Sequence, residues 1–113
     1  MQSDLAIVIL NYNTCHLLNT YLPSVVKHSN GYRIIFVDNA SKDESVNFVR
    51  ENYQQIEVIC LEENYGFTGG YNRALKQIKA KYYCLLNTDV EVTENWIEPI
   101  INLMKKKEKM TKF

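Results

Sequence analysis

Four short apolar runs recur along the chain, and longer segments with apolar residues at helical spacing separate them. The runs are residues 5–10 (LAIVIL), 34–37 (IIFV), 56–61 (IEVICL) and 82–86 (YYCLL). They are rich in β-branched or aromatic residues and are bounded by polar residues or glycine, which is typical of strands. Three of them are almost entirely apolar, as expected for parallel strands that are covered on both faces.

The intervening segments predict four helices. The first spans the apolar positions of residues 17–26, where Pro23 predicts a kink or two short helices. The second carries a capping-box pattern at residues 41–44, the third is expected to begin near Gly70, and the fourth to follow Thr93 as its N-cap. Strict alternation of strand and helix predicts an α/β fold: three α/β/α layers around a mainly parallel four-stranded sheet with right-handed crossovers.

Composition narrows the class of protein. A chain of 113 residues has room for one compact domain, and 13 basic residues balance 13 acidic ones, which argues against a nucleic-acid partner. Three cysteines without a paired motif predict free thiols, those in the apolar runs being buried, in a reducing compartment. No signal-peptide pattern or apolar stretch of about 18 residues occurs, so we expect a cytoplasmic protein.

The basic end of the chain has two interpretations. Residues 105–112 (KKKEKMTK) are most simply a solvated helix terminus, where cations complement the helix dipole. The alternative is peripheral contact with the inner face of a membrane.

Polar residues follow three of the four predicted strands. They are NYNT at 11–14, DNAS at 38–41 and NTDVE at 87–91. In open α/β sheets, ligands bind outside the carboxyl ends of the strands. The three stretches should therefore share one edge of the sheet, where Asn11, Asp38 and Asp89 converge.

Each of these residues also has an ordinary structural interpretation. Asn11, Asn13 and Asp38 are residue types that shape turns, and Asp89 and Glu91 are compatible with solvated loop acids. A single carboxylate at a strand end is nevertheless enough to hold Mg²⁺ or Mn²⁺, because these ions complete their shells with water and phosphate oxygens.

Residues 63–73 (ENYGFTGGYNR) form the most unusual stretch. They hold three of the four glycines and lead from the third strand into the third helix. Glycine allows close backbone approach, and a helix N-terminus favours anionic groups. The stretch matches neither a dinucleotide-binding fingerprint nor a P-loop, and a tight strand–helix turn is the plain alternative.

Taken together, four motifs resemble the nucleotide-sugar-binding portion of the family 2 glycosyltransferases, which have a GT-A fold. They are VILNYN, IIFVDNASKDES, ENYGFTGGYNRAL and LLNTDVEV, and they span residues 7–92 in the order of that family. The pattern is most similar to the rhamnosyltransferase-like bacterial members, which act in polysaccharide biosynthesis.

The resemblance implies roles for individual residues. The residues that it implies in binding a UDP- or dTDP-sugar are Asn11, Tyr12, Asn13, Asp38, Gly66, Gly69, Gly70, Asn72 and Asn87. Asp89 would hold Mg²⁺ or Mn²⁺ against the diphosphate, and Asn87 stands where the family usually has the first acid of a D-x-D pair. The metal would neutralise charge on the departing nucleoside diphosphate while an acceptor hydroxyl of a saccharide or lipid-linked sugar inverts the anomeric centre.

The chain departs from the family pattern after its fourth helix. The general base and the acceptor site of the family have no counterpart here, so residues 1–113 are expected to be a truncated donor-binding portion that transfers no sugar alone. A truncated sheet should expose an edge and an apolar patch that favour a homo-oligomer. The alternatives are a non-catalytic nucleotide-binding or protein-interaction remnant and, less favoured, a nucleotidyltransferase-like enzyme.

Overall fold

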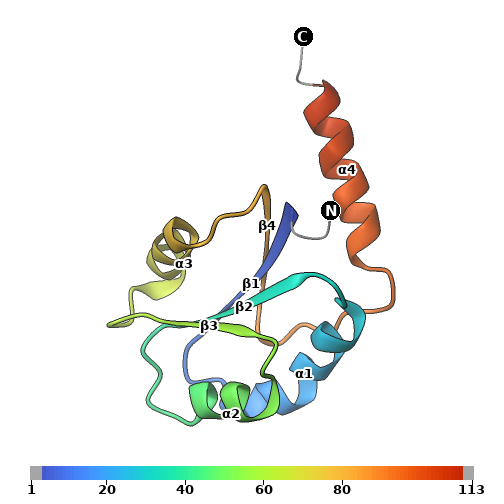
Figure 1. Cartoon of the computed structure of the whole chain (residues 1–113). Coiled ribbons are helices and arrows are strands. Elements are labelled where there is room, and N and C mark those ends of the chain that lie inside the picture. Colours follow the sequence, from blue (N-terminus) through green and yellow to red (C-terminus); the bar gives the residue numbers. More distant parts are fainter. Residues whose placement is uncertain (1–3, 111–113) are drawn as a thin grey trace.

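The chain folds into one parallel sheet with helices on both faces (Figure 1). The computed structural model describes residues 4–110. In sequence order the elements are β1 (Leu5–Asn11), α1 (Cys15–His28), β2 (Arg33–Asp38), α2 (Ser45–Asn52), β3 (Glu57–Cys60), α3 (Gly66–Gln77), β4 (Tyr82–Leu86) and α4 (Ile97–Met110). The strand order is β3-β2-β1-β4 and every pairing is parallel, which confirms the predicted fold class.

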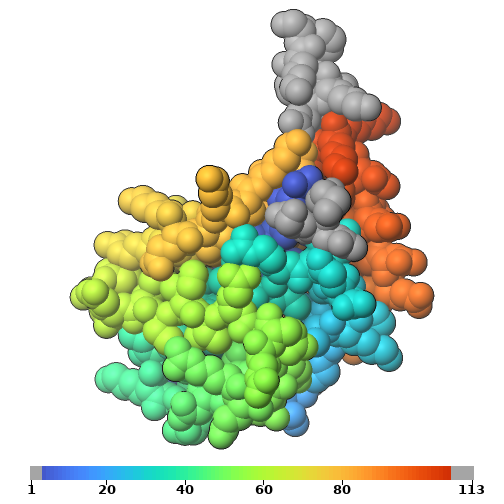
Figure 2. Space-filling view, in the orientation of Figure 1, coloured from blue at the N-terminus to red at the C-terminus, as the bar shows by residue number. Residues whose placement is uncertain are grey.

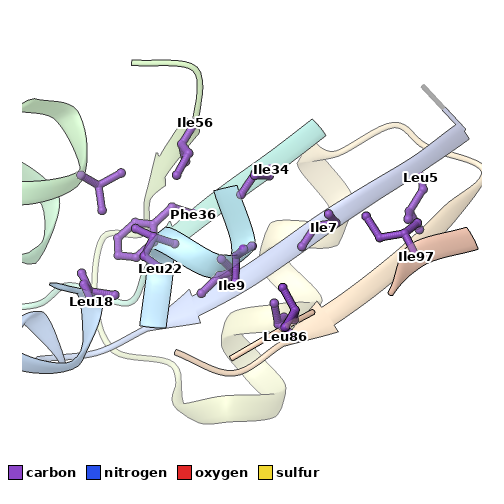
Figure 3. Packing of buried hydrophobic residues seen from close by; sticks show 13 residues of the cluster. Leu5, Ile7, Ile9, Leu18, Leu22, Ile34, Phe36, Ile56, Leu86 and Ile97 are labelled. Carbon is purple, nitrogen blue, oxygen red and sulfur yellow. The ribbon is translucent and has the colours of Figure 1, made fainter. Parts of the chain in front are cut away.

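Two apolar layers fill the two faces of the sheet. On one face, alternate residues of β1 and β2 pack against α1, α2 and the first residue of α4 (Figure 3). Phe36 and Ile7 are fully buried in this layer, and each such side chain contributes about 2 kcal/mol of burial free energy. On the other face, Val8 and Val37 pack against α3, where Ala74 allows a close approach. Both central strands are therefore covered on both sides, as their sequences predict.

The two outer strands are less covered than their apolar sequences predict. Strand β3 is only partly buried. Strand β4, which pairs with β1 and forms the other edge of the sheet, leaves Tyr83 and Leu85 exposed, Leu85 to 48%. Both residues lie opposite β1 residues of the α3 face, so this part of that face has less cover than the centre. The predicted exposed edge is therefore present at β4, and an apolar patch that favours a homo-oligomer stays a prediction.

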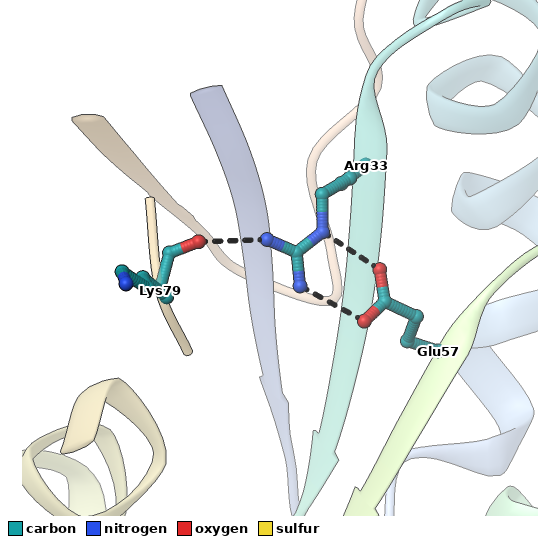
Figure 4. A network of polar contacts seen from close by, with 3 residues as sticks. All are labelled: Arg33, Glu57 and Lys79. Carbon is teal, nitrogen blue, oxygen red and sulfur yellow. Dashed lines mark hydrogen bonds and ion pairs between the residues drawn. The ribbon is translucent and has the colours of Figure 1, made fainter. Parts of the chain in front are cut away.

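An ion pair joins the first residues of β2 and β3. Arg33 of β2 makes a two-pronged contact with Glu57 of β3, with N–O distances of 2.9 and 3.0 Å, and also donates to the backbone oxygen of Lys79 (Figure 4). The hydrogen bond from Arg33 lowers the pKa of Glu57. This contact joins β2, β3 and the segment before β4 at the end of the sheet opposite the polar loops.

The last helix extends beyond the rest of the fold. Figures 1 and 2 show α4 projecting past the sheet and the other helices. Its exposed apolar residues are Ile100, Leu103 and Met104. No helix within residues 4–110 is long and apolar enough to cross a membrane.

Several predicted boundaries were wrong. Helix α1 is one continuous helix through Pro23, so the alternative of two short helices was wrong, while a kink there stays a prediction. Helix α3 begins at Gly66, four residues earlier than expected. The capping box at residues 41–44 does not form, because α2 begins only at Ser45 and no side chain at Glu44 caps it. The N-cap predicted at Thr93 is also wrong, since α4 begins at Ile97.

The cysteine prediction was correct in part. All three cysteines are free thiols. The expectation that those in apolar runs are buried was wrong for Cys60, which is exposed because it ends the edge strand β3, and Cys84 is half-buried.

Candidate functional site

The loops after β1, β2 and β4 leave the sheet at one edge. Asn11 at the end of β1 lies opposite Asp38 at the end of β2, and Ile9 lies opposite Leu86 at the end of β4. The strand order reverses direction at β1, because β2 lies on one side of it and β4 on the other. Such a switch point is where open α/β sheets form a ligand crevice. The strand register thus confirms that the three loops leave the sheet at one edge, and the convergence of Asp89 with Asn11 and Asp38 stays a prediction.

At the ends of β1 and β2, buried polar side chains bond to one another. Asn11 and Asp38 are only 1% and 3% exposed. The Nδ2 of Asn11 donates to Asp38 Oδ1 (2.9 Å) and to Ser41 Oγ (3.1 Å). Ser41 in turn donates its Oγ to Asp38 Oδ1 (2.6 Å) and its amide to Asp38 Oδ2 (2.8 Å), while Thr14 donates to Asn11 Oδ1. We call Asn11, Asp38, Asn39 and Ser41 the strand-end network.

This network changes the interpretation of two predicted binding residues. The amide of Asn11 and the carboxylate of Asp38 face other protein groups, so their first role is to hold the loops in shape. Unpaired, a buried carboxylate or amide would cost several kcal/mol, and the mutual bonds avoid that penalty. Contact of either residue with a nucleotide stays a prediction.

A second ring of bonds fastens the outer parts of the same loops. Asn13 has a left-handed φ of 55°, and its Oδ1 accepts the amide of Lys42 at 2.8 Å. Asp43 accepts the first amide of α1, that of Cys15 (3.0 Å), and both the amide and the hydroxyl of Ser45 at the start of α2 (3.0 and 2.5 Å). Burial alone would raise the pKa of Asp43, but these hydrogen bonds outweigh it and lower the pKa. One carboxylate thus caps two helices.

The glycine-rich turn is fastened to the strand-end network through Asn39. Its Oδ1 accepts the amide of Tyr65 (3.0 Å) and its Nδ2 donates to the carbonyl oxygen of Gly66 (2.9 Å). Gly66 has a left-handed φ of 75°, which glycine adopts without strain. A Cβ on Gly70 would lie 2.9 Å from Asn39 Nδ2 and 3.0 Å from a Leu10 methyl, so the helix approaches the network as closely as glycine permits.

A cleft of about 270 Å³ opens between these loops. Its lining residues are Leu10, Tyr12, Asn39, Asn64, Gly66 and Phe67. Two exposed aromatic side chains, Tyr12 from the β1 loop and Phe67 from the first turn of α3, stand with polar amides of Asn39 and Asn64. Flat, partly apolar surfaces with a few polar groups suit a planar ligand with polar edges.

The cleft includes some predicted residues and adds others. Tyr12 and Gly66 line it, whereas Gly69 and Gly70 lie in α3 and Asn72 is exposed on that helix. Sequence reasoning did not assign Leu10, Asn39, Asn64 or Phe67 to the site, although all four lie within the quoted motifs or beside them. Phe67, an aromatic residue at the start of a helix, was the feature of the sequence that could have indicated a binding surface.

The end of β4 presents a different environment. Asn87, Asp89 and Glu91 are exposed. Within residues 4–110 no hydrogen bond or ion pair engages Asp89, and no three His, Cys, Asp or Glu side chains are grouped to hold a metal ion. The donor set is one carboxylate with a neighbouring amide oxygen. This set fits Mg²⁺ or Mn²⁺ when phosphate oxygens and water complete the shell, and does not fit a permanently held metal.

Two thiols near the site are unsuited to nucleophilic catalysis. Burial raises the pKa of Cys15, with Asp43 and Glu44 adding to the effect, and burial raises the pKa of Cys84. Because the thiolate is the reactive form, a raised pKa argues against covalent chemistry at either position.

Another cleft of similar size, about 300 Å³, lies elsewhere. Its lining residues are Lys27, His28, Asn30, Tyr32, Glu94, Asn95, Ile97 and Glu98. It lies between the end of α1 and the start of α4, on the side of the sheet where β2 begins. No strand delivers its carboxyl end there, so the position of the first cleft is the better candidate for ligand binding.

Comparisons with known proteins agree with this geometry. The model of the family described as glycosyl transferase family 2 matches residues 6–111. An uncharacterized glycosyltransferase of Haemophilus influenzae is 22% identical over 110 residues, which cover 94% of this chain and 34% of that protein.

Solved structures show the same fold. TarS 1–349 of S. aureus in complex with UDP has a TM-score of 0.77 at 20% identity, with 91% of this chain and 32% of that chain covered. The mannosyltransferase PcManGT from Pyrobaculum calidifontis, in complex with GDP-Man and Mn²⁺, has a TM-score of 0.67 at 19% identity, covering 78% and 28%. The chain therefore spans about a third of the length of these relatives.

Proposed function

Because the chain belongs to glycosyltransferase family 2, we propose that it binds the nucleoside diphosphate part of a sugar donor at the cleft between the β1 loop and the turn into α3. The observation that carries the proposal is the position of that cleft at the carboxyl ends of β1 and β2, with Tyr12 and Phe67 beside it. Structural neighbours in complex with UDP, UDP-GlcNAc or GDP-Man support the ligand class.

Within this proposal, different residues contact different parts of the sugar donor. Tyr12 and Phe67 would offer faces for the base, and Asn13 and Asn72 would flank its sugar. Asp38 would reach the nucleoside only through the one lone pair of Oδ2 that the network leaves over. The start of α3 at Gly66 would favour the negative diphosphate, with Gly69 and Gly70 letting the helix come close.

The metal end of the site is proposed at β4. Asp89 would hold Mg²⁺ or Mn²⁺ and Asn87 would accept or donate a hydrogen bond beside it; the exposed Glu91 has no assigned contact. When bound, such an ion neutralises charge on the diphosphate leaving group. The Mn²⁺ in the PcManGT complex supports this choice of ion.

Finer features of the enzyme are also proposals. We expect inversion at the anomeric centre, a UDP- or dTDP-sugar such as a rhamnosyl or hexosyl donor, and a saccharide or lipid-linked acceptor, all by resemblance to the family. Residues 1–113 would bind the donor without transferring the sugar, since the resemblance places the general base beyond the residues that match. A cytoplasmic location with the basic residues Lys105, Lys106 and Lys107 near a membrane surface fits the same enzyme class.

A calorimetric titration tests the proposal. UDP and dTDP are titrated into the wild-type chain and into Asp89→Ala, each with and without Mn²⁺. Binding should strengthen with Mn²⁺ in the wild type, and Asp89→Ala should lose that gain while keeping its metal-free affinity. Glu51→Ala, which removes an exposed carboxylate on α2, is the matched control and should behave as wild type.

Two outcomes would change the conclusion. Binding that ignores both Mn²⁺ and the Asp89 substitution would show the metal assignment to be wrong. Absence of any binding would favour a second candidate, a protein-interaction role or homo-oligomer formed through the free edge of β4. The exposed Leu85 and Leu103 are the observation that favours this candidate.

A further inference from the structure

Asn39 joins three segments that are far apart in the sequence. Its side chain is buried, at 2% exposure, and every hydrogen bond of the residue crosses to another segment. Its backbone N–H donates to the carbonyl oxygen of Asn11 (2.9 Å), while its side-chain amide forms hydrogen bonds with the backbone of Tyr65 and Gly66 (3.0 and 2.9 Å). The end of β1 and the turn into α3 are thereby both fixed to the end of β2.

These two segments are the opposite walls of the candidate cleft. The β1 side contributes Leu10 and Tyr12, and the α3 side contributes Asn64, Gly66 and Phe67. Asn39 lies between the walls and lines the cleft itself. Its bonds to both sides therefore link the two walls through the end of β2.

Packing leaves Asn39 little freedom to move. Gly70 in α3 lies so close that a Cβ there would come within 2.9 Å of Asn39 Nδ2. Real Cβ contacts essentially never come this close, so the amide is held against the helix backbone. The side chain is bonded in the plane of its amide and blocked from the helix side, which fixes both its position and its orientation.

No other residue type reproduces both bonds at this site. The side chain must accept from Tyr65 and donate to Gly66, and an amide of this length does both. An aspartate would keep the acceptor but turn a negative oxygen toward the Gly66 carbonyl, and alanine would lose both bonds and leave two buried backbone groups without partners.

We propose that Asn39 is a positioning residue that sets the spacing of the two cleft walls and thereby the affinity for the nucleoside part of the ligand. The inference rests on the proposed function, because it assumes that a nucleotide occupies the cleft. It assigns to Asn39 an action through the backbone of Tyr65 and Gly66, and the metal end at Asp89 is independent of it.

The test combines two measurements on Asn39→Ala and Asn39→Asp. Amide hydrogen exchange is followed across residues 64–68, and calorimetry measures binding of UDP and of inorganic pyrophosphate, each with Mn²⁺. We expect faster exchange at Tyr65 and Gly66 and a fall in UDP affinity of about tenfold, the equivalent of one lost hydrogen bond. Pyrophosphate affinity should fall less than UDP affinity, because its contact with the metal end at Asp89 is independent of Asn39.

The control variant is Asn52→Ala. Asn52 also donates its Nδ2 to a backbone carbonyl, that of Phe48 (2.8 Å), but it lies exposed near the end of α2. It should leave the exchange of residues 64–68 and both affinities as in wild type. If Asn39→Ala does not fold, Gly70→Ala disturbs the same contact without removing the Asn39 side chain and is measured in its place.

The outcomes separate this inference from the proposed function. Wild-type binding of UDP that persists unchanged in the Asn39 variants overturns the inference and leaves the proposed function standing. An equal loss of UDP and pyrophosphate affinity also overturns it, because a general loss of structure would then explain both. A wild-type chain that binds neither UDP nor pyrophosphate overturns the proposed function, and the inference with it.

Discussion

The ends of β1 and β2 and the end of β4 lie at the same edge of the sheet but are built differently. At the ends of β1 and β2, Asn11, Asp38 and Asn39 of the strand-end network are buried, and their side chains bond to other residues. At the end of β4, Asp89 is exposed and no described residue bonds to it. Both ends carry an aspartate just inside or just past a strand, so residue type alone does not distinguish them.

The difference indicates how each end would meet a ligand. The β1 and β2 end is already organised by the chain, so binding there would cost little ordering of side chains. The β4 end would be ordered by a metal and a diphosphate arriving together, because its single carboxylate cannot hold an ion by itself. Nucleoside and metal binding should therefore respond differently to the same kind of substitution.

The sharpest test of this comparison replaces each aspartate by alanine. Asp38→Ala removes one of the two acceptors of the Asn11 side-chain amide and the acceptor of the Ser41 backbone N–H. We expect a loss of about 2–4 kcal/mol in the free energy of unfolding. Asp89→Ala should change that free energy by less than about 0.5 kcal/mol, since an exposed side chain without partners is removed. Urea unfolding followed by circular dichroism measures both free energies. Equal losses in the two variants would contradict the distinction between a buried Asp38 and an open Asp89.

A methyl group at Gly70 probes the same network from the helix side. In an ordinary helix Gly→Ala stabilises by about 0.5–1 kcal/mol, but here the added Cβ would press on Asn39 and Leu10, so we expect Gly70→Ala to destabilise by about 1–3 kcal/mol. Gly69→Ala is the matched control in the next position, where the nearest atom is the Cβ of Tyr65 at 3.1 Å. Its cost should be clearly smaller in the same urea experiment, and a larger one would contradict the close approach at Gly70.

The smallest expected effect concerns pH and the carboxylate that caps two helices. Because the pKa of Asp43 is lower in the folded chain than its usual 3.8, its stabilisation is present above pH 3.8 and is lost as pH falls through the folded pKa. Asp43→Asn keeps a capping side chain but has no charge to titrate, so its stability should fall less below pH 4, by about 0.5 kcal/mol for this exposed group. Thermal unfolding between pH 6 and pH 3 measures the difference, and parallel curves would contradict the predicted role.

The arrangement of strands was predictable because burial imposes a simple pattern. Residues such as Ile7 and Phe36 must leave water, and four short runs of them separated by amphipathic segments can bury only as a covered parallel sheet. Because the strands run parallel, the loops of Asn11, Asp38 and Asp89 leave the sheet at one edge. This much follows from local composition and the chirality of crossovers.

The helix starts were less predictable because their caps are not local. Ser41 and Glu44 have the spacing of a capping box, yet Ser41 bonds to Asp38 and Asp43 caps α2 through Ser45. When several hydrogen-bond partners are available to a side chain, the three-dimensional arrangement decides which bond forms, and the sequence does not give that arrangement. The same holds for Pro23, which α1 accommodates within an unbroken helix.

By itself, the sequence determined the fold class, the edge of the sheet where a site would form and the residue types available there, because hydrophobic periodicity is a local property and alternating strands and helices favour a parallel sheet. Only the tertiary structure decided which of those polar residues are buried supports and which remain open. Asp38 and Asp89 follow equally apolar strands, and their surroundings alone separate them. Burial with three hydrogen bonds turns the first carboxylate inward. The second is exposed beyond the edge strand β4 and bonds to no residue within 4–110.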